Sequence, residues 1–280
     1  MKIRALENSL NDCGEMPVWH QKEQVLYWVD VLKPKLFSYH LTSDSYYEYT
    51  LPDCIYFMEI APDGYLYAIL GNDLVQLHIN DHKLQIKKII ENLCDDSRVR
   101  FNDGKFDAKG RLFSGTMDFE QKNPIGKLYC ISPSGKIEVV DEGFIVSNGT
   151  DFNHDFTSMY FTDSRQSTIY QYDYNLENGS ISNKRPLVIY DHGDGVPDGM
   201  AVDRNGDLWI AVWSGWRIDH FSSDGQLIES IKTTARNMTC PVFAGDNQQL
   251  LFATSATFDL EAINDMGKDA GKTLLIDLKD

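Results

Sequence analysis

The chain repeats an apolar residue followed by an aromatic residue, each time within a short run of apolar and polar positions. The pairs are Leu26-Tyr27, Leu66-Tyr67, Leu112-Phe113, Met159-Tyr160, Leu208-Trp209 and Leu251-Phe252. Their aromatic members are 40, 46, 47, 49 and 43 residues apart. A period of this length, with several short strands per repeat and no helical segment, is typical of a β-propeller. The sequence therefore predicts an all-β fold, a six-bladed β-propeller with four-stranded antiparallel blades, formed by residues 1–280 as a single domain.

The fifth repeat shows its strands most clearly, because turn sequences that contain glycine separate its apolar runs. From the innermost strand outwards, the expected strands are residues 199–203, 208–213, 217–222 and 227–233. The sixth repeat supplies three further strands, at residues 240–243, 250–255 and 273–278. A propeller that does not close exposes unpaired strand edges. We therefore expect residues 2–7 to provide the fourth strand of the last blade.

Composition narrows the class of protein. The 280 residues are 42% hydrophobic, and no apolar run is long enough for a membrane span. The five cysteines form no C-x-x-C pair, which fits reduced thiols in a cytoplasmic protein. The net charge of −16 disfavours nucleic acid or an anionic membrane as partner, because phosphate binding requires clustered lysine and arginine. A small molecule remains the expected partner, and the oligomeric state is left open.

Polar residues recur at one position of the repeat, 11 or 12 residues before the aromatic residue. This shared position holds Glu15, Asn102, Asn148 and Asp198 in the first, third, fourth and fifth repeats. It lies just before each predicted innermost strand, so these side chains should meet at one end of the central channel. The second and sixth repeats have a more apolar character there, with Ile55 or Tyr56 and Cys240 or Pro241. Polar groups that converge beside an apolar wall are typical of a small-molecule site.

An alternative interpretation is that these residues only form turns, because asparagine and aspartate before glycine are common turn residues. It applies to Asn102-Asp103-Gly104, Asn148-Gly149 and Asp198-Gly199. It does not account for Glu15, since a turn at this point does not require a glutamate. The recurrence of the position in four repeats favours a site.

Two carboxylates and one or two amide oxygens form a set of hard oxygen ligands. Such a set favours one divalent cation, Ca²⁺, Mg²⁺, Mn²⁺ or Fe²⁺, and Zn²⁺ is the less favoured alternative because it prefers imidazole and thiolate. So few protein ligands would leave coordination positions for water or substrate, which is a catalytic arrangement. Arg100 lies two residues before Asn102, so in an extended strand both side chains share one face. We expect Arg100 to orient a substrate as a hydrogen-bond donor.

The motifs around these residues resemble those of the gluconolactonase-like family, which includes regucalcin (senescence marker protein 30) and bacterial sugar-lactone hydrolases. The resemblance covers nearly the whole chain. It is carried by residues 14–19 (GEMPVW), 100–105 (RFNDGK), 110–117 (GRLFSGTM), 147–149 (SNG), 160–164 (YFTDS), 197–200 (PDGM) and 208–211 (LWIA). Several positions at the expected pocket edge depart from the family pattern, such as Met16 where glycine is usual, but none of the departures removes a ligand.

The resemblance implies a metal-dependent hydrolase of carboxylic esters that opens a sugar-acid (aldono-) lactone to the aldonate, and hence a role in carbohydrate metabolism. The metal ligands of the family fall on Glu15, Asn148 and Asp198. Its substrate-binding positions fall on Arg100, Asn102 and Glu120. Asp198 is the only carboxylate besides Glu15 at the shared position, so we expect it also to take the proton from the attacking water.

Two other functions remain open on the same fold. One is hydrolysis of another ester, such as an aryl or phosphorus ester, in a more apolar pocket. The other is a non-catalytic propeller that binds calcium or a protein partner, since one fold hosts many functions. A Ser-His-Asp hydrolase is disfavoured, because the chain has no Gly-x-Ser-x-Gly motif and no histidine at the shared position.

Overall fold

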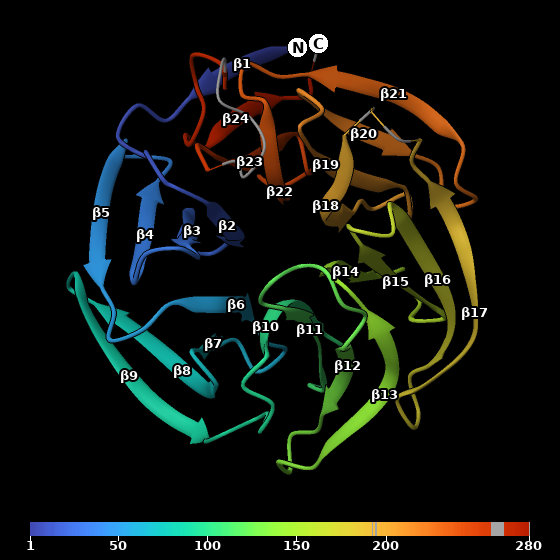
Figure 1. Cartoon of the computed structure of the whole chain (residues 1–280). Coiled ribbons are helices and arrows are strands. Elements are labelled where there is room, and N and C mark those ends of the chain that lie inside the picture. The colour runs from blue at the N-terminus through green and yellow to red at the C-terminus, as the bar shows by residue number, and fades with distance from the viewer. Residues whose placement is uncertain (192, 194, 259–265, 280) are drawn as a thin grey trace. The chain divides into compact units, whose positions relative to one another are not determined.

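The computed structural model describes residues 1–191, 193, 195–258 and 266–279. In this part of the chain, 24 strands form six four-stranded antiparallel sheets, and no helix is present (Figure 1). The predicted fold class, a six-bladed β-propeller with four-stranded antiparallel blades, is confirmed. The described residues therefore contain no helix that is long and apolar enough to cross a membrane. We number the blades 1 to 6 by the chain order of their innermost strands.

The chain divides into two compact units, residues 1–54 with 192–280 and residues 55–191. Each unit contains three blades. The prediction that all 280 residues act as one domain stays a prediction.

The first unit contains blades 1, 5 and 6. Blade 1 has the order β2-β3-β4-β5, with bounds Gly14–His20, Val25–Asp30, Lys35–His40 and Ser45–Thr50. Blade 5 has the order β18-β19-β20-β21, with bounds Val196–Val202, Leu208–Trp213, Arg217–Phe221 and Leu227–Lys232. Blade 6 has the order β22-β23-β24-β1, with bounds Asn237–Ala244, Leu250–Ala256, Leu274–Asp277 and Lys2–Ala5.

The second unit contains blades 2, 3 and 4. Blade 2 has the order β6-β7-β8-β9, with bounds Ile55–Ile60, Leu66–Leu70, Asp73–Asn80 and Lys83–Ile90. Blade 3 has the order β10-β11-β12-β13, with bounds Val99–Phe106, Leu112–Asp118, Gly126–Ile131 and Ile137–Phe144. Blade 4 has the order β14-β15-β16-β17, with bounds Ser147–Phe152, Ser158–Asp163, Thr168–Asn175 and Ser180–Ile189.

The repeated apolar and aromatic pairs lie in the second strand of each blade. Leu26, Met159, Leu208 and Leu251 are fully buried there. Four of the aromatic residues, Tyr67, Phe113, Trp209 and Phe252, belong to clusters that join neighbouring blades, as Phe252 of blade 6 packs with Trp28 of blade 1. Full burial of a side chain of this size contributes about 1.5–3 kcal/mol to stability. The repeat therefore stands out in the sequence because the second strand of each blade supplies large apolar side chains to the core.

The strands expected in blade 5 are confirmed to within one residue at each end, except for the start of the innermost strand. The innermost strand begins at Val196 instead of residue 199. Its pairing with β19 continues through Pro197, opposite Val212, and then shifts register before Met200. A register shift of this kind, a β-bulge, places extra residues on one strand without ending it.

The N-terminal strand completes blade 6, as predicted. In β1, Ala5 pairs with Leu274 of β24, and the next residue continues the contact, since the Leu6 amide donates to the Thr273 carbonyl over 2.9 Å. The strand ends at Ala5 instead of residue 7. Leu6 turns into the core, where only 4% of it is exposed.

Candidate active site

A β-bulge interrupts the pairing of the innermost strand in every blade. In blades 1, 3, 4 and 5 the register shifts directly after Glu15, Asn102, Asn148 and Pro197, the residue before Asp198. The shared sequence position is therefore the site of the bulge. These residues lie inside the innermost strands, not just before them as expected, because strand pairing resumes on both sides of the bulge. Bulges are frequent beside active sites, where they redirect a side chain.

The turn-only interpretation of these residues is wrong. Asn148-Gly149 lies in β14 and Asp198-Gly199 lies in β18. Gly199 serves close packing instead, because a Cβ atom there would lie 2.6 Å from Cys240 Cβ on the neighbouring strand β22. Asn102-Asp103-Gly104 lies in β10, with Asp103 in the left-handed region at φ 60°. Bulges and turns use the same residue types because both need unusual backbone angles.

In the first unit, Glu15 and Asp198 are both buried, with 6% and 5% exposed. They lie on β2 and β18, and β22 packs against both strands. The Thr239 hydroxyl of β22 donates to the Gly14 carbonyl over 2.6 Å, next to Glu15. Burying a carboxylate is costly unless a cation or several donors balance it. Two buried carboxylates at corresponding bulges are therefore suited to a cation.

In the second unit, Arg100 and Asn102 are held together. Arg100 Nη1 donates to Asn102 Oδ1 over 2.6 Å and to the Phe101 carbonyl over 2.9 Å. The guanidinium also lies over the ring of Tyr56, 4.6 Å from its centre. Asn102 Nδ2 donates to the Ser147 carbonyl over 2.7 Å, beside Asn148. The expected shared face of Arg100 and Asn102 is confirmed, and the guanidinium plane is fixed by these contacts.

Asn148 presents a buried oxygen in need of a partner. Its Nδ2 donates to Ser164 Oγ over 3.1 Å. Its Oδ1 is one of four buried side-chain atoms in the described part of the chain that have no hydrogen-bond partner. Leaving a buried acceptor unsatisfied costs about 1–3 kcal/mol. A bound cation would satisfy this oxygen, so Asn148 fits the role of metal ligand that the motif implies.

Similarity to known proteins identifies the family of this chain. Residues 13–257 match the model of the SMP-30/gluconolactonase/LRE-like region. The chain belongs to this family. It is 31% identical to a pentonolactonase of Haloferax volcanii over 246 residues, which is 88% of this chain and 82% of the relative. It is 28% identical to human regucalcin over 250 residues, 87% of this chain and 83% of that protein. A luciferin-regenerating enzyme superimposes with a TM-score of 0.90 at 27% identity, over 98% of this chain and 94% of the other.

In this member of the SMP-30/gluconolactonase family, Glu120 is exposed, whereas the other predicted site residues are buried or partly buried. It lies in the turn after β11, its side chain is 70% exposed, and it pairs with Lys122 over 3.3 Å. Asp118 organises this turn by accepting from the amides of Glu120 and Lys122. The substrate-binding role of Glu120 stays a prediction.

A partly buried group of charges, which was not expected from the sequence, lies on the same innermost strands of the second unit. Lys105 Nζ lies 2.9 Å from Glu59 Oε1 and 3.5 Å from Asp151 Oδ1. Burial by itself would lower the pKa of Lys105, but the Asp151 and Glu59 carboxylates outweigh it and raise that pKa. Burial raises the pKa of Glu59, and it raises the pKa of Asp103 to about 7. The signal in the sequence was a charged residue three or four positions after the shared position in the second, third and fourth repeats.

Tyr56 is the other residue whose role was missed. It was expected to form part of the apolar side of the channel, yet its ring holds the guanidinium of Arg100. An arginine over an aromatic face gains about 0.5–2 kcal/mol. The aromatic residue at the shared position of the second repeat was the available signal.

Proposed function

We propose that this protein is a lactonase that uses one divalent cation to hydrolyse a sugar-acid lactone to the aldonate. Membership of the SMP-30/gluconolactonase family supports an ester hydrolase, and one relative is named a pentonolactonase. The observation that carries the metal dependence is the buried, unpartnered Oδ1 of Asn148, at the same bulge position as the buried carboxylates of Glu15 and Asp198. The oxygen-only donor set favours Ca²⁺, Mg²⁺, Mn²⁺ or Fe²⁺ over Zn²⁺.

Glu15, Asn148 and Asp198 are proposed to hold the cation. When bound, a divalent cation supplies Lewis acidity that favours attack on an ester carbonyl. Asp198 takes a proton from the attacking water through its second carboxylate oxygen. The water oxygen bonds to the carbonyl carbon, the ring C–O bond breaks, and the proton passes to the leaving oxygen, which becomes a hydroxyl of the aldonate.

Arg100, Asn102 and Glu120 are proposed to bind the hydroxyl groups of the sugar. Arg100 suits this role because Asn102, the Phe101 carbonyl and the Tyr56 ring fix its guanidinium. A fixed donor loses less entropy when a substrate binds. We further propose that the protein works in the cytoplasm, since its five free cysteines fit a reducing compartment.

The test is lactone hydrolysis by chelator-treated protein, measured by proton release on a panel of five-carbon and six-carbon aldonolactones. We expect activity above the spontaneous rate only after Mn²⁺, Mg²⁺, Ca²⁺ or Fe²⁺ is added. Glu15→Gln should lose most of it, because an amide is a weaker ligand than a carboxylate for a hard cation. Glu142→Gln, an exposed change in the outermost strand β13, is the matched control.

Each alternative predicts a different result. Full activity in metal-free protein contradicts the proposed metal dependence. Turnover of aryl or phosphorus esters, with none of the lactones, favours another ester hydrolase. Cation uptake without turnover of any ester favours a binding protein.

A further inference from the structure

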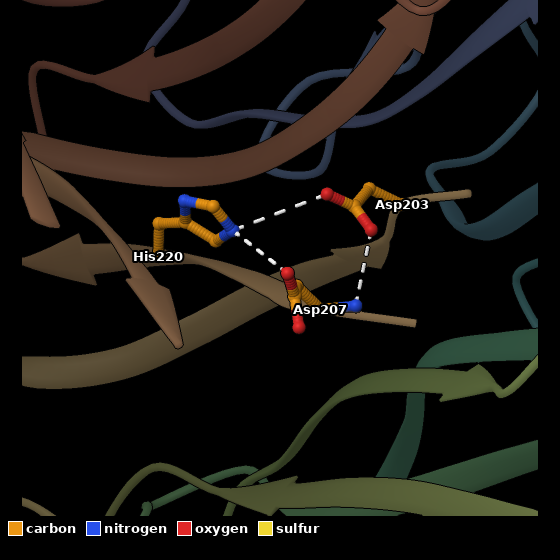
Figure 2. A group of neighbouring side chains, drawn as sticks. All are labelled: Asp203, Asp207 and His220. Carbon is orange, nitrogen blue, oxygen red and sulfur yellow. Dashed lines mark hydrogen bonds and ion pairs between the residues drawn. The ribbon is translucent and has the colours of Figure 1, made fainter. Parts of the chain in front are cut away.

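Blade 5 carries a second group of potential metal ligands, outside the shared bulge position. Asp203 and Asp207 lie in the turn between β18 and β19, and His220 lies on β20. Figure 2 shows both carboxylates directed at the same ring nitrogen, His220 Nε2, at 3.9 Å from Asp203 and 3.6 Å from Asp207. One ligand atom from each residue lies within 4.8 Å of the other two. These residues do not stand out in the sequence, because both aspartates belong to an ordinary turn.

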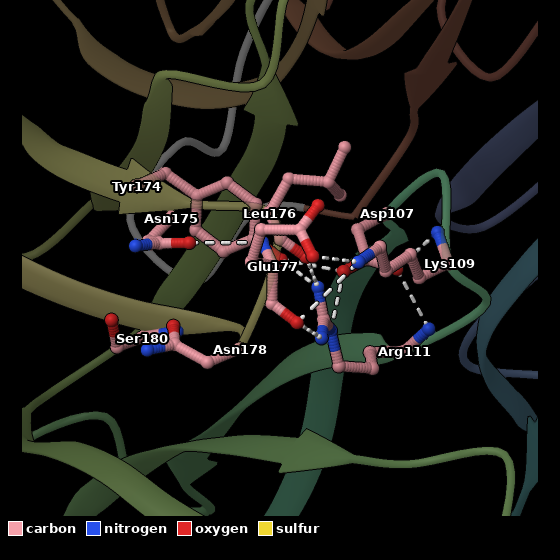
Figure 3. Close-up of polar contacts among 9 residues, drawn as sticks. All are labelled: Asp107, Lys109, Arg111, Tyr174, Asn175, Leu176, Glu177, Asn178 and Ser180. Atoms are coloured by element: carbon pink, nitrogen blue, oxygen red, sulfur yellow. Dashed lines mark hydrogen bonds and ion pairs between the residues drawn. The ribbon is translucent and has the colours of Figure 1, made fainter.

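The corresponding turn of blade 3 shows what is unusual here. In both turns the first aspartate holds the backbone: Asp107 Oδ1 accepts from the Arg111 amide over 2.8 Å, and Asp203 Oδ1 accepts from the Asp207 amide over 3.0 Å. In blade 3 the other oxygen of Asp107 is neutralised by Arg111 Nε at 2.6 Å (Figure 3). In blade 5 the position of this arginine is occupied by Asp207. The ion pair of Asp107 and Arg111 in blade 3 thus corresponds to two carboxylates, Asp203 and Asp207, in blade 5.

His220 is the basic group that faces these charges. Its Nε2 is shielded from water and has no hydrogen-bond partner, since both carboxylates are too distant to accept a proton from it. Its Nδ1 lies 3.4 Å from Glu229 Oε1 on β21. A carboxylate only accepts hydrogen bonds, so this contact places a proton on Nδ1. In neutral imidazole Nε2 then presents a lone pair to two carboxylates.

The ring of His220 is fixed in this orientation. It stacks on Trp209 with 4.1 Å between ring centres and an interplanar angle of 19°. Trp209 Nε1 in turn donates to Asp203 Oδ2 over 3.2 Å. Three carboxylates, those of Asp203, Asp207 and Glu229, therefore surround one imidazole. A single positive charge on the imidazole would balance only one of their three negative charges. A lone pair and two carboxylates around one point form a site for a divalent cation.

We propose that Asp203, Asp207 and His220 bind a Zn²⁺-type transition metal ion, separate from the cation of the proposed lactonase site. Imidazole with carboxylates suits Zn²⁺ better than Ca²⁺ or Mg²⁺, which prefer oxygen ligands alone. Ligand bonds of about 2.0–2.2 Å in a tetrahedral site place ligand atoms about 3.3 Å apart. The two separations between His220 Nε2 and the carboxylates, 3.9 and 3.6 Å, are thus close to those of a bound ion, and the ligand atoms of the two aspartates lie within 4.8 Å of each other. Glu229 would orient the imidazole from its other nitrogen, as carboxylates commonly do behind metal-bound histidines.

The bound ion would join the β18–β19 turn to β20 within one blade. Its effect is therefore expected on stability, because a ligand that binds only the folded state raises the melting temperature. A hundredfold excess over Kd corresponds to a rise in Tm of about 5–10 °C for a chain of this size.

Two substitutions remove the site with residues that other blades already tolerate. Asp207→Arg introduces the arginine that blade 3 has at the same turn position. His220→Gln introduces the glutamine that blades 2 and 4 have opposite the second-strand aromatic residue, Gln76 and Gln171. Glu15→Gln is the control, since it weakens only the proposed lactonase site.

The experiment is calorimetric titration of the chelator-treated full chain with Zn²⁺, with Tm measured in parallel. We expect the unmodified chain and Glu15→Gln to share a Zn²⁺-binding component and a Tm rise that Asp207→Arg and His220→Gln both lack. Equal Zn²⁺ binding and Tm response in all four proteins would overturn the proposal. The absence of Zn²⁺ binding in the unmodified chain, with both nitrogens of His220 protonated in ¹⁵N spectra, would overturn it as well.

Discussion

Single residues at the β-bulges determine which side chains the innermost strands can bring to a site. Asp198 lies within the bulge of β18, and the close approach of Cys240 requires glycine at the next position. A side chain other than glycine at position 199 would therefore displace β18 from β22 and Asp198 with it. The proposed roles of Asp198, as metal ligand and as base, can be separated by one substitution.

Asp198→Asn should keep part of the metal affinity, because an amide oxygen can still coordinate, yet lose the base. We expect kcat to fall on the order of 100-fold or more, the scale for loss of a general base. The measurement is steady-state lactone hydrolysis at saturating metal, with metal affinity from calorimetry. A near-normal kcat would assign the base elsewhere, with Glu15 and Glu120 as the next candidates.

Asp103 should make stability depend on pH. Burial raises its pKa from 3.8 to about 7, so the folded chain retains a proton that the unfolded chain releases. The stability that the protonated Asp103 contributes is fully present below pH 3.8, and it is lost as the pH rises through about 7. Asp103→Asn removes the ionisation, and asparagine also tolerates the left-handed backbone at this residue. The variant should be more stable than the unmodified chain by about 2–4 kcal/mol at pH 8.

The measurement for Asp103 is urea unfolding of both proteins between pH 5 and pH 8. The difference in unfolding free energy between Asp103→Asn and the unmodified chain should become smaller as the pH falls. Parallel pH profiles for the two proteins would show that the carboxyl of Asp103 does not titrate in this range.

At the scale of elements, polar contacts connect neighbouring blades at their edges. Arg111 of blade 3 donates to Tyr174 Oη of blade 4 over 3.2 Å and to the Leu176 carbonyl, and Tyr174 Oη donates to Asp107 (Figure 3). Asp107 is fully buried and the Arg111 side chain is 12% exposed. This ion pair is therefore largely shielded from water, and removal of the Arg111 charge leaves the Asp107 carboxylate without compensation.

Arg111→Ala should destabilise the chain by about 3 kcal/mol, because it leaves the buried Asp107 carboxylate without its cation. Lys109→Ala is the control: Lys109 pairs with Glu177 over 2.9 Å between the same two blades, but both side chains are exposed. Exposed pairs contribute little. Chemical denaturation of both variants checks the difference, and equal midpoints would contradict it.

At the scale of the whole molecule, the chain depends on its N-terminal strand to complete blade 6. Deletion of residues 1–8 removes the pairing of β1 with β24 and the buried Leu6. We expect Tm to fall by at least about 5 °C, since loss of a buried leucine alone costs about 2–5 kcal/mol. Lys2→Ala, a change of an exposed side chain in the same strand, is the control. An unchanged Tm in the deletion would show that blade 6 is stable with three strands.

The sequence by itself determined the number of blades, their second strands, the strand that completes blade 6 and the position shared by the predicted site residues. These features are visible because burial between blades imposes a period on the apolar and aromatic residues. Only the tertiary structure showed that the shared position is a bulge. A bulge and a turn use the same residue types, and they differ in whether the strand continues to pair with its neighbour on both sides. The tertiary structure also decided the groups around Lys105 and His220, because their members come from different strands and turns that meet only in the folded chain.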